Sequence, residues 1–451
     1  LCYKLNQYYE QKLRQDKTAH DKIEFEIIFN TYDFMTDTRL KELAEYGFDD
    51  VEISQLRNAL FEIAKQTLEH YDEICEEDLR SLGQLTELRH ELRKHSPLAE
   101  TNVMKLYSYI DELLDSIKDH GTPQFTRQAR CAFMARSFCR TLVEKGYFTK
   151  QEMDDFMLSI PTVASEFERD FDLYSHGKLS RDDFNHLYGH LRLGTYDIRS
   201  DSYRNIYFDV ASANLTGNNK VKQEAKSLDL ERLQVALDEA GIPVTPEKFI
   251  EFIKKATQNR EYFKFEFTKS LSLMLDVIVK LGEVMAIARE DMSYLEIQDL
   301  LSYHSRDSYI QTIETRRRFY HVNSYLVLPE VIFDVGDIDV IDIDEARPNF
   351  ITNKVVEAPI VNLDEDHDSD ITGKIVALTK ADPGYDWIFA KDIAGFVTKY
   401  GGAASHMAIR CAEFGIPAAI GCGEKIYQRI HRMQIMCLDC ENGRITEKQS
   451  Q

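Results

Sequence analysis

Residues 398–406 read Thr-Lys-Tyr-Gly-Gly-Ala-Ala-Ser-His, and this stretch decides the architecture of the C-terminal part of the chain. A buried strand is predicted to end at Thr398. Gly401 and Gly402 then allow the backbone to turn tightly and to approach a ligand closely, and Ser405 has the side chain of a helix N-cap. His406 therefore begins a new helix, where unpaired N–H groups and the helix dipole favour an anion.

A histidine at this position has two chemical uses and one plain structural use. As a cation it can bind a phosphate, and as a neutral nucleophile it can attack a phosphoryl group through its lone pair. The positive end of the helix dipole favours the neutral imidazole, and the helix N–H groups can hold the oxygens of a phosphohistidine. A histidine beside two glycines is also commonly no more than a polar cap, so the wider pattern has to separate these interpretations.

Strand-like and helix-like segments alternate around this stretch. Strands are predicted at residues 373–378, 395–398 and 417–421, and helices at residues 386–390 and 405–414. Together they predict a small β/β/α domain over residues 371–451, within the usual lower range of domain size.

Residues 1–330 carry a different pattern, in which Pro and Gly are sparse and apolar residues recur every three or four positions. One such stripe, typical of a helix with one buried face, is formed by Leu271, Leu275, Ile278, Leu281 and Met285. We therefore predict a multidomain chain, with a large, mostly α-helical domain over residues 1–330. The length of 451 residues agrees, because single cores stop growing at about 250–300 residues.

Charge is distributed unevenly along the chain. The 55 basic and 77 acidic residues give a net charge of −22, which disfavours binding to nucleic-acid phosphates and to anionic membranes. The 37 residues from Asp334 to Asp370 hold 12 acids and 2 bases, a local net charge of −10. β-branched residues between Val331 and Ile343 predict short extended segments, and self-repulsion predicts a mobile acidic linker over residues 331–370.

The sequence also predicts the cellular compartment of the protein. No window of about 20 apolar residues predicts a membrane span, and no signal peptide is recognisable. The eight cysteines are scattered, as expected of reduced thiols, so a cytoplasmic protein is predicted. The chain starts with Leu1 inside a predicted helix, and we expect an N-terminal truncation of a longer polypeptide.

Residues 398–417 resemble the motif T-x-x-G-G-x-x-S-H-x-A-I-x-A-R-E-x-G-I-P of the phosphohistidine (swivelling) domain of PEP-utilising enzymes. The matching residues are Thr398, Gly401, Gly402, Ser405, His406, Ala408, Ile409, Glu413, Gly415, Ile416 and Pro417. The resemblance implies that His406 is the catalytic residue that becomes phosphorylated, and that the phosphate is bound at Thr398, Gly401, Gly402 and Ser405. Ala404 stands where many relatives carry Thr, so regulation by phosphorylation there is not expected. Arg410-Cys411 also departs from the pattern and is expected to matter only for packing.

Two features that the sequence lacks narrow the choice among the enzymes of this family. Only 45 residues follow His406 (451 − 406), whereas a pyruvate-binding (β/α)8 barrel needs roughly 250, so synthesis of phosphoenolpyruvate is not expected. No G-x-x-x-x-G-K-[ST] loop is present, and the family's ATP-grasp domain is expected upstream of Leu1. The order of helical body and His domain resembles the rifampin phosphotransferase-like enzymes, and the body is most similar to the branch with L-glutamine kinase and capsule polysaccharide biosynthesis enzymes.

This resemblance implies an ATP-dependent phosphotransferase. His406 would take a pyrophosphoryl group from ATP with release of AMP, hydrolysis would release phosphate, and the remaining phosphoryl group would pass to an acceptor, here the amide of L-glutamine. ATP and Mg²⁺ are the implied cofactors, bound mainly by the absent domain, and no metal ligands are expected in this chain. Two alternatives stay open: another small-molecule acceptor such as an antibiotic of rifampin type, and a stand-alone phosphocarrier phosphorylated by a separate subunit.

Residues 188–198, Tyr-Gly-His-Leu-Arg-Leu-Gly-Thr-Tyr-Asp-Ile, are similar to a G-H-R-G-x-G-E/Y-D segment of these enzymes. A glycine-flanked His-x-Arg turn presents a base together with a ligand for phosphate or carboxylate. The residues expected to bind the acceptor are Gly189, His190, Arg192, Tyr196, Asp197, Arg130 and Lys264. The alternative is a structural turn in which Arg192 and Asp197 only pair with each other. The expected partners are the small-molecule acceptor and the chain's own ATP-grasp domain, and neither nucleic acid nor a membrane.

Overall fold

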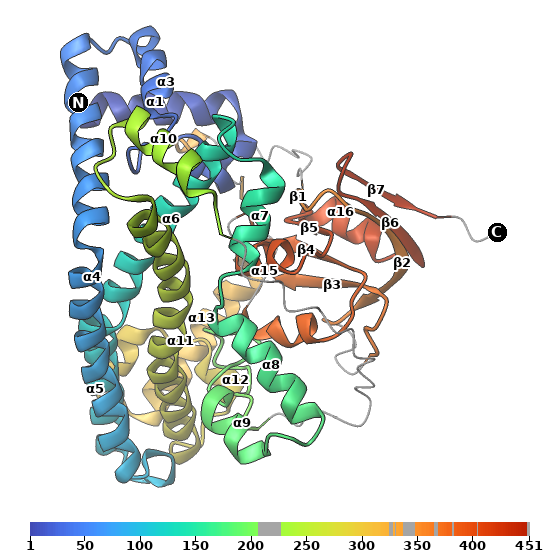
Figure 1. The fold of residues 1–451 in the computed structure, drawn as a ribbon. Coiled ribbons are helices and arrows are strands. Elements are labelled where there is room, and N and C mark those ends of the chain that lie inside the picture. Colours follow the sequence, from blue (N-terminus) through green and yellow to red (C-terminus); the bar gives the residue numbers. More distant parts are fainter. Residues whose placement is uncertain are drawn as a thin grey trace.

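The computed structural model describes residues 1–205, 227–323, 328–329, 331–336, 348–364, 369–380, 383–403 and 405–448. These residues form two parts, a large helical body and a small C-terminal sheet domain that lies beside the middle of the body (Figure 1). The predicted multidomain architecture is therefore confirmed.

The body is built from α-helices of very different lengths. They are α1 (Cys2–Gln15), α2 (Ile23–Glu26), α3 (Thr36–Leu40), α4 (Asp50–Lys94), α5 (Val103–His120), α6 (Thr122–Glu144), α7 (Lys150–Leu158), α8 (Val163–Ser175), α9 (Arg181–Tyr188), α10 (Leu230–Ala240), α11 (Pro246–Val284), α12 (Arg289–Met292) and α13 (Arg306–Asn323). Short 3-10 helices η1 (Lys17–Lys22), η2 (Lys41–Tyr46), η3 (Pro97–Ala99) and η5 (Ile297–Leu300) connect some of them.

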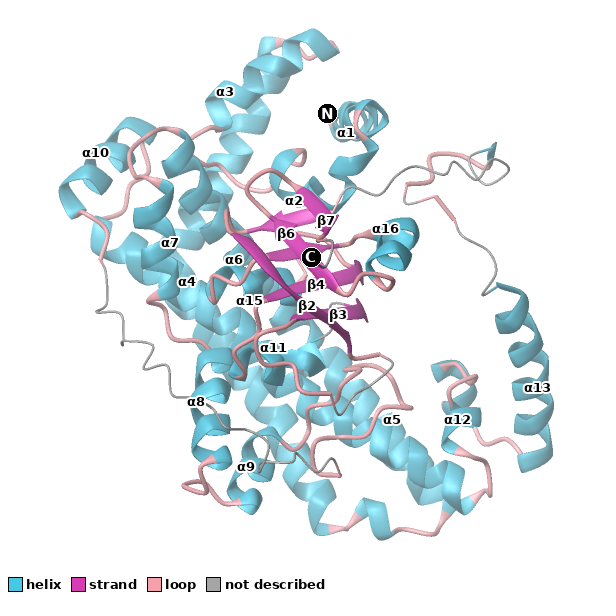
Figure 2. Cartoon of the chain, turned by 90° about the vertical axis from the view of Figure 1, so that its right-hand side faces the viewer, coloured by secondary structure: helices cyan, strands magenta, loops and turns pink. Residues whose placement is uncertain are grey.

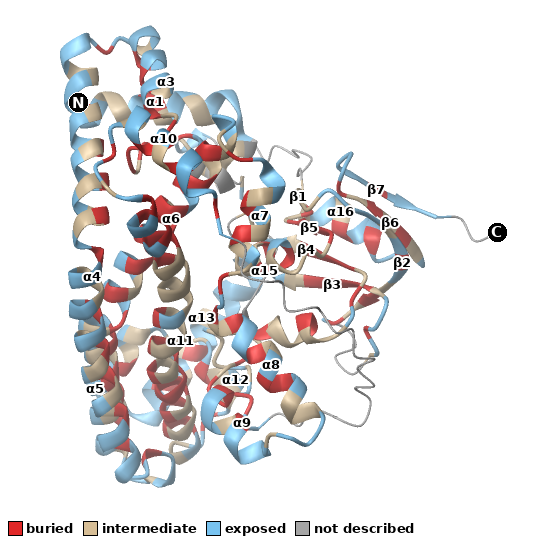
Figure 3. Ribbon diagram, viewed as in Figure 1, coloured by how far each residue is buried: buried red, intermediate tan, exposed pale blue. Residues whose placement is uncertain are grey.

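Helix α11 is the central element of the body. It packs along α4, α5 and α6, and these long helices lie side by side in Figure 1. Its first half buries Phe249 in one apolar cluster, and its second half buries Ile278 and Leu281 in another. Leu275 is also buried, and buried positions recur along the helix in Figure 3. The predicted stripe is therefore confirmed, and burial of this face stabilises the body.

The N-terminus of α11 also follows its sequence signal. Thr245 accepts a hydrogen bond from the Lys248 N–H at 3.4 Å, and Pro246 occupies the first helical position. Both features satisfy or remove backbone N–H groups that a helix start leaves unpaired.

The C-terminal domain is a seven-stranded mixed sheet. Its strands are β1 (Asn349–Ile351), β2 (Val355–Asn362), β3 (Ile375–Lys380), β4 (Gly395–Tyr400), β5 (Ala418–Ile420), β6 (Ile435–Asp439) and β7 (Arg444–Glu447). Their spatial order is β1-β5-β4-β3-β2-β6-β7. Strands β2 to β5 are parallel, and β1, β6 and β7 are antiparallel additions at the edges.

Helices cover both faces of this sheet. Successive strand residues point to opposite faces, so Val376 and Leu378 of β3 pack with α15 (His406–Glu413) and the 3-10 helix η6 (Pro383–Ala390), whereas Ile375 and Ala377 pack with α16 (Gly423–Ile430). Figure 2 shows α15 and α16 on opposite sides of the strands. Burial on both faces explains the continuous apolar run at the centre of the sheet.

The predicted linker and domain boundary need correction. Strand β2 pairs with β3 on one side and with β6 on the other, and it buries Ala358 and Val361. The sheet domain therefore begins by Asn349 and not at Ile371, because these apolar residues complete its core. Residues 337–347 and 365–368 of the predicted linker lie outside the described residues.

The predicted extended segments after Val331 are also wrong over the described residues 331–336, which form no strand. The Phe333 ring lies 4.1 Å from the guanidinium carbon of Arg14 on α1, so this segment is held by a cation–π contact in place of strand pairing. Val335 is exposed, and its β-branched side chain finds no apolar face to cover.

All eight cysteines are free thiols. Among the described helices, none combines the length and apolar character that crossing a bilayer requires.

Candidate active site

The turn between β4 and α15 is built as its sequence indicates. Gly401 has φ +128°, a backbone conformation that favours glycine. An added Cβ at Gly421 would lie 2.2 Å from the Gly401 carbonyl oxygen, so the two glycines permit a close approach of β5 to this turn. The Thr398 hydroxyl accepts a hydrogen bond from the Gly421 N–H at 3.1 Å, and the Ser405 hydroxyl accepts one from the Ala408 N–H at 3.4 Å.

These contacts assign local roles to the predicted phosphate-binding residues. Thr398 is fully buried and ties the end of β4 to the end of β5. Gly402 accepts a hydrogen bond from the Ser405 N–H at 3.0 Å, and Ser405 caps α15, as predicted. Ala404 lies outside the described residues.

His406 begins α15 and contacts a carboxylate of its own domain. Its Nε2 lies 2.6 Å from Asp386 Oδ1, on η6. Burial raises the pKa of the Asp386 carboxyl, but the charges of His406 and Arg410 lower it by more, so the pKa lies below its ordinary value. An ionised carboxylate only accepts hydrogen bonds, and the His406 Nε2–H therefore donates to Asp386.

A second carboxylate reaches His406 from the helical body. Glu261 Oε2 on α11 lies 3.9 Å from His406 Nδ1. Burial raises the pKa of Glu261, but His406 and Arg260 outweigh burial and bring the pKa below its ordinary value. The imidazole is only 10% exposed. His406 thus lies at the junction of the two domains, between two ionised carboxylates.

Sequence reasoning missed the role of Arg410, which it assigned to packing. The Arg410 side chain is 3% exposed, its Nη1 donates to Glu413 at 2.8 Å, and its Nε lies 3.6 Å from Asp386 Oδ1. The guanidinium carbon lies 4.4 Å from the centre of the Phe414 ring. A cation four residues after His406 falls on the same helix face, and this spacing is the signal that could have identified it.

The segment that follows α9 packs against η6 of the C-terminal domain. Tyr203 donates to the Gly384 carbonyl oxygen at 2.5 Å. An added Cβ at Gly384 would lie 1.8 Å from the Arg192 carbonyl oxygen, so only glycine permits this approach. Trp387 of η6 packs with the apolar cluster that includes Phe167 of α8. The predicted acceptor segment therefore forms part of the contact between the two domains.

Arg192 and Asp197 do not pair with each other, so the alternative interpretation of this turn is wrong. Arg192 donates to the Ser272 hydroxyl, the Ser272 carbonyl, the Ser200 carbonyl and the Asp276 carboxylate, so each guanidinium nitrogen has a partner within the protein. Asp197 pairs with Arg199 and not with Arg192. Arg192 therefore anchors its segment to α11 through Ser272 and Asp276.

The other residues predicted to bind the acceptor lie in different surroundings. His190 is buried against Phe265, with ring centres 4.6 Å apart, and its Nε2 has no hydrogen-bond partner among the described residues. Lys264 lies close enough to Asp386 and Glu261 for its charge to lower the pKa of both carboxyl groups. Tyr196 and Arg130 are exposed, and Gly189 joins α9 to the turn.

Four basic side chains surround His190. Burial lowers its pKa well below the ordinary 6.5, and the charges of Lys269, Arg89, Arg204 and Arg93 lower it further. Arg93 and Arg204 line a pocket of about 570 Å³ together with η3 and Leu273. His190 is thus neutral at pH 7, because burial and the neighbouring positive charges both disfavour a charged imidazole.

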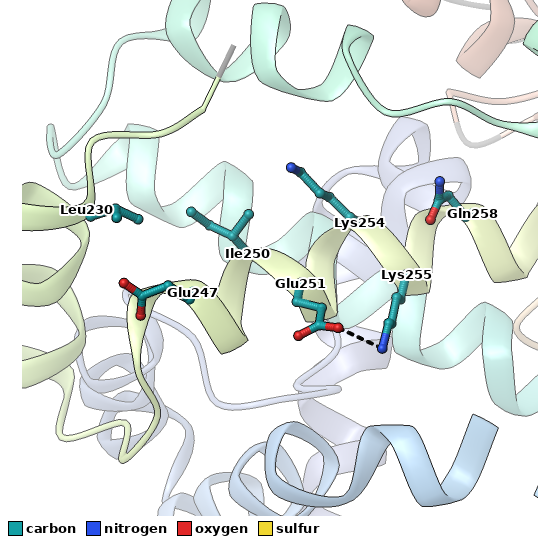
Figure 4. A pocket seen from close by; sticks show the side chains of 7 residues that line it. All are labelled: Leu230, Glu247, Ile250, Glu251, Lys254, Lys255 and Gln258. Carbon is teal, nitrogen blue, oxygen red and sulfur yellow. Dashed lines mark ion pairs between the residues drawn. The ribbon is translucent and has the colours of Figure 1, made fainter. Parts of the chain in front are cut away.

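Another pocket, of about 450 Å³, lies along the first half of α11 (Figure 4). It is lined by Leu230, Glu247, Ile250, Glu251, Lys254, Lys255 and Gln258. Glu251 and Lys255 form an ion pair there at 2.7 Å. Its two acids and two bases cancel in charge, and it holds none of the residues around His406. Within the described ranges, no group of three or more His, Cys, Asp or Glu side chains is placed to hold a metal ion.

Comparison with known proteins agrees with this geometry. Residues 371–443 match the PEP-utilising enzyme mobile domain. The mobile domain thus contains η6, α15 and the His406–Asp386 contact. The chain is also similar to rifampicin phosphotransferase of Bacillus subtilis (strain 168), with 27% identity over 222 residues. That match covers 45% of this chain and 24% of the relative's length, so it spans about a quarter of the relative. The two findings thus relate residues 371–443 to the mobile domain of PEP-utilising enzymes and part of the chain to a phosphotransferase.

Proposed function

We propose that this chain is the carrier and acceptor-binding part of an ATP-dependent phosphotransferase. The observation that carries the proposal is the position of His406, which projects from the mobile domain against α11 with Glu261 3.9 Å from its Nδ1. A carrier histidine has to meet the acceptor on another domain, and this contact is the meeting point.

The proposed reaction has three balanced steps. His406 attacks ATP, forms a nitrogen–phosphorus bond to a pyrophosphoryl group and releases AMP. Water then cleaves the phosphoanhydride and releases phosphate, which leaves phosphohistidine. Finally the acceptor takes the phosphoryl group and His406 is regenerated. Mg²⁺ accompanies ATP in such reactions, and its ligands are proposed to lie mainly on an ATP-grasp domain.

Glu261 is proposed to assist the last step. Transfer breaks the bond between phosphorus and the imidazole, the acceptor's proton passes to water, and a proton held on Nδ1 makes the imidazole a better leaving group. The pKa of Glu261 lies below its ordinary value, so its carboxylate is ionised at neutral pH and favours a proton on Nδ1, 3.9 Å away. Lys264, one turn along α11, is proposed to offset the negative charge of the transferring group.

The proposed acceptor is the amide nitrogen of L-glutamine. The net reaction is then ATP + L-glutamine + H₂O → L-glutamine phosphate + AMP + phosphate. The support for L-glutamine as the acceptor is the resemblance of the helical body to the branch of these enzymes that includes L-glutamine kinase. An acceptor hydroxyl of rifampicin type is the second candidate, favoured by the similarity to rifampicin phosphotransferase.

The test uses the chain joined to its ATP-binding portion. Phosphorus NMR of a mixture with ATP, Mg²⁺ and L-glutamine is expected to reveal AMP, phosphate and a phosphoramidate signal. His406→Asn is expected to abolish all three products, whereas His431→Asn, elsewhere in the mobile domain, leaves them unchanged. Turnover by His406→Asn would refute the proposal.

Two further outcomes separate the alternatives. AMP formation without a phosphoramidate signal would reject L-glutamine, and rifampicin is then the acceptor to add. Phosphorylation of His406 by a separate subunit, with no transfer to any small molecule, would indicate a stand-alone phosphocarrier.

A further inference from the structure

A buried guanidinium near His406 lacks part of its hydrogen bonding. Arg410 is 3% exposed, and among the described residues its Nε and Nη2 have no hydrogen-bond partner, although both atoms are buried. Its Nη1 is bound to Glu413, and the plane of the group lies against Phe414. Burial of a charged N–H donor without an acceptor is costly, so this arrangement leaves a place for an anion.

The position of Asp386 indicates where that anion sits. The same oxygen, Oδ1, lies 2.6 Å from His406 Nε2 and 3.6 Å from Arg410 Nε. The oxygens of a phosphoryl group bonded to Nε2 lie about as far from that nitrogen as a short hydrogen-bond partner does. The carboxylate oxygen therefore stands where a phosphoryl oxygen would stand, and two negative groups cannot share this place.

We propose that Arg410 binds the phosphoryl group of phospho-His406, and that this group displaces Asp386 from Nε2. Nε and Nη2 of Arg410 then donate to phosphoryl oxygens, in the bidentate geometry that guanidinium groups favour. Arg410 is a phosphoryl-binding residue that the mobile-domain motif does not assign. The inference rests on phosphorylation of His406 as proposed above.

Displacement of Asp386 has a consequence for domain docking. Asp386 belongs to η6, and η6 also carries Gly384, which accepts the hydrogen bond from Tyr203 of the helical body. A shift of Asp386 therefore acts on the element that holds the two domains together.

The test phosphorylates the chain with phosphoramidate. In this reaction the phosphorus–nitrogen bond of the reagent breaks, ammonia leaves, and a bond forms from His406 to phosphorus as the imidazole gives up its N–H proton. Phosphorus NMR then follows the phosphoryl signal against pH. Arg410 favours the dianion, so the apparent pKa of the phosphoryl group in the wild-type chain is expected below that of free Nε2-phosphohistidine. An equal value, or phosphorylation at Nδ1, overturns the inference.

A variant and a matched control sharpen the result. Arg410→Met is expected to raise the apparent pKa of the phosphoryl group by about one unit, a tenfold change in proton affinity. Arg429→Met, on the opposite face of the sheet, removes an arginine that donates to the Ile445 carbonyl and is expected to cause no shift. An unchanged titration in Arg410→Met overturns the inference. If Arg410→Met does not fold, the apparent pKa of the phosphoryl group in the wild-type chain, compared with that of free Nε2-phosphohistidine, still tests the role of Arg410.

Absence of any phosphorylation of His406 in the wild-type chain is a separate outcome. It would count against the proposed function itself. Phosphorylation of His406 together with unaltered phosphoryl titration would refute only the role of Arg410.

Discussion

Glu261 of the helical body and His406 of the mobile domain lie 3.9 Å apart across the junction of the two domains. The residues are 145 positions apart in sequence (406 − 261), and only docking of η6 on the segment after α9 brings them together. The contact places a carboxylate of the body beside the free face of the imidazole, opposite the nitrogen held by Asp386.

Glu261→Gln is expected to slow transfer from phospho-His406 to the acceptor by on the order of 10²-fold, because the charge that favours a proton on Nδ1 of the leaving imidazole is lost. Phosphorylation of His406 by ATP is expected to persist. Rapid-quench measurement of phosphoprotein and product separates the two steps. Glu283→Gln is the matched control on α11, since Glu283 is exposed and pairs only with Lys280. Equal slowing of both steps would contradict a role in transfer.

The pH dependence of transfer follows from the same carboxylate. The pKa of Glu261 lies below its ordinary value of 4.5, so the carboxylate is ionised above that pH and becomes protonated only below it. Transfer is therefore expected to stay constant from pH 7 down to about 4.5. Single-turnover rates at a series of pH values check this, and an acid limb near pH 6 that Glu261→Gln removes would contradict it.

Gly384→Ala is expected to undock the mobile domain. The new Cβ would lie 1.8 Å from the Arg192 carbonyl oxygen, and neither backbone can yield by that distance without separation of η6 from the body. Small-angle scattering is expected to detect a larger radius of gyration, and transfer to the acceptor is expected to fall. Gly83→Ala is the control, because its Cβ would meet nothing within 4 Å. An unchanged scattering curve for Gly384→Ala would contradict the docking role.

Arg192→Met is expected to destabilise the helical body by about 3–5 kcal/mol, because it leaves the partly buried Asp276 carboxylate without its cation. Urea denaturation measures this effect. Arg199→Met breaks the more exposed pair with Asp197 and is expected to cost about 0–1 kcal/mol. Unaltered stability of Arg192→Met with a raised KM for the acceptor would indicate that Arg192 binds the acceptor.

His190 is expected to make stability depend on pH. Its pKa in the folded chain lies well below 6.5 because the imidazole is buried among basic groups. Between that low value and 6.5 the unfolded chain binds a proton and the folded chain does not, so stability is full above 6.5 and is lost as pH falls. The slope contributed by His190 is expected to be about 1.4 kcal/mol per pH unit.

Denaturation at pH 7.5 and 5.5 measures this slope in wild type and in His190→Phe, which removes it. Identical slopes in wild type and His190→Phe would contradict the buried neutral state.

Local patterns predicted most of the fold. The stripe that contains Ile278 and Leu281, the cap at Thr245 and the glycine turn before His406 each depend on neighbours within a few residues. Short-range sterics and burial of one face determine such features. The acidic composition of residues 334–370 led to the wrong prediction of a linker. The apolar residues of β2 lie within this acidic segment, and the strands that pair with it, β3 and β6, lie farther along the chain.

The candidate site was predicted only in part. His406 was identified from its motif, whereas Asp386, Glu261 and Arg410 were not, because no fixed spacing links the first two to it. The anchoring role of Arg192 was not predicted, since a buried structural arginine and a ligand-binding arginine look alike in sequence. Its partner Asp276 lies 84 positions away, and only the packing of its segment on α11 reveals the pair.

By itself the sequence determined the helical body, the small β-rich domain and the histidine that heads α15, because each is encoded by residues close together along the chain. Tertiary structure alone decided which groups face that histidine. Asp386 and Glu261 reach His406 from η6 and α11, and Gly384 has space for its contact only because the two domains fit against each other. Electrostatic effects act over a few ångströms in space whatever the separation in sequence, so the environment of His406 is a property of the folded, docked chain.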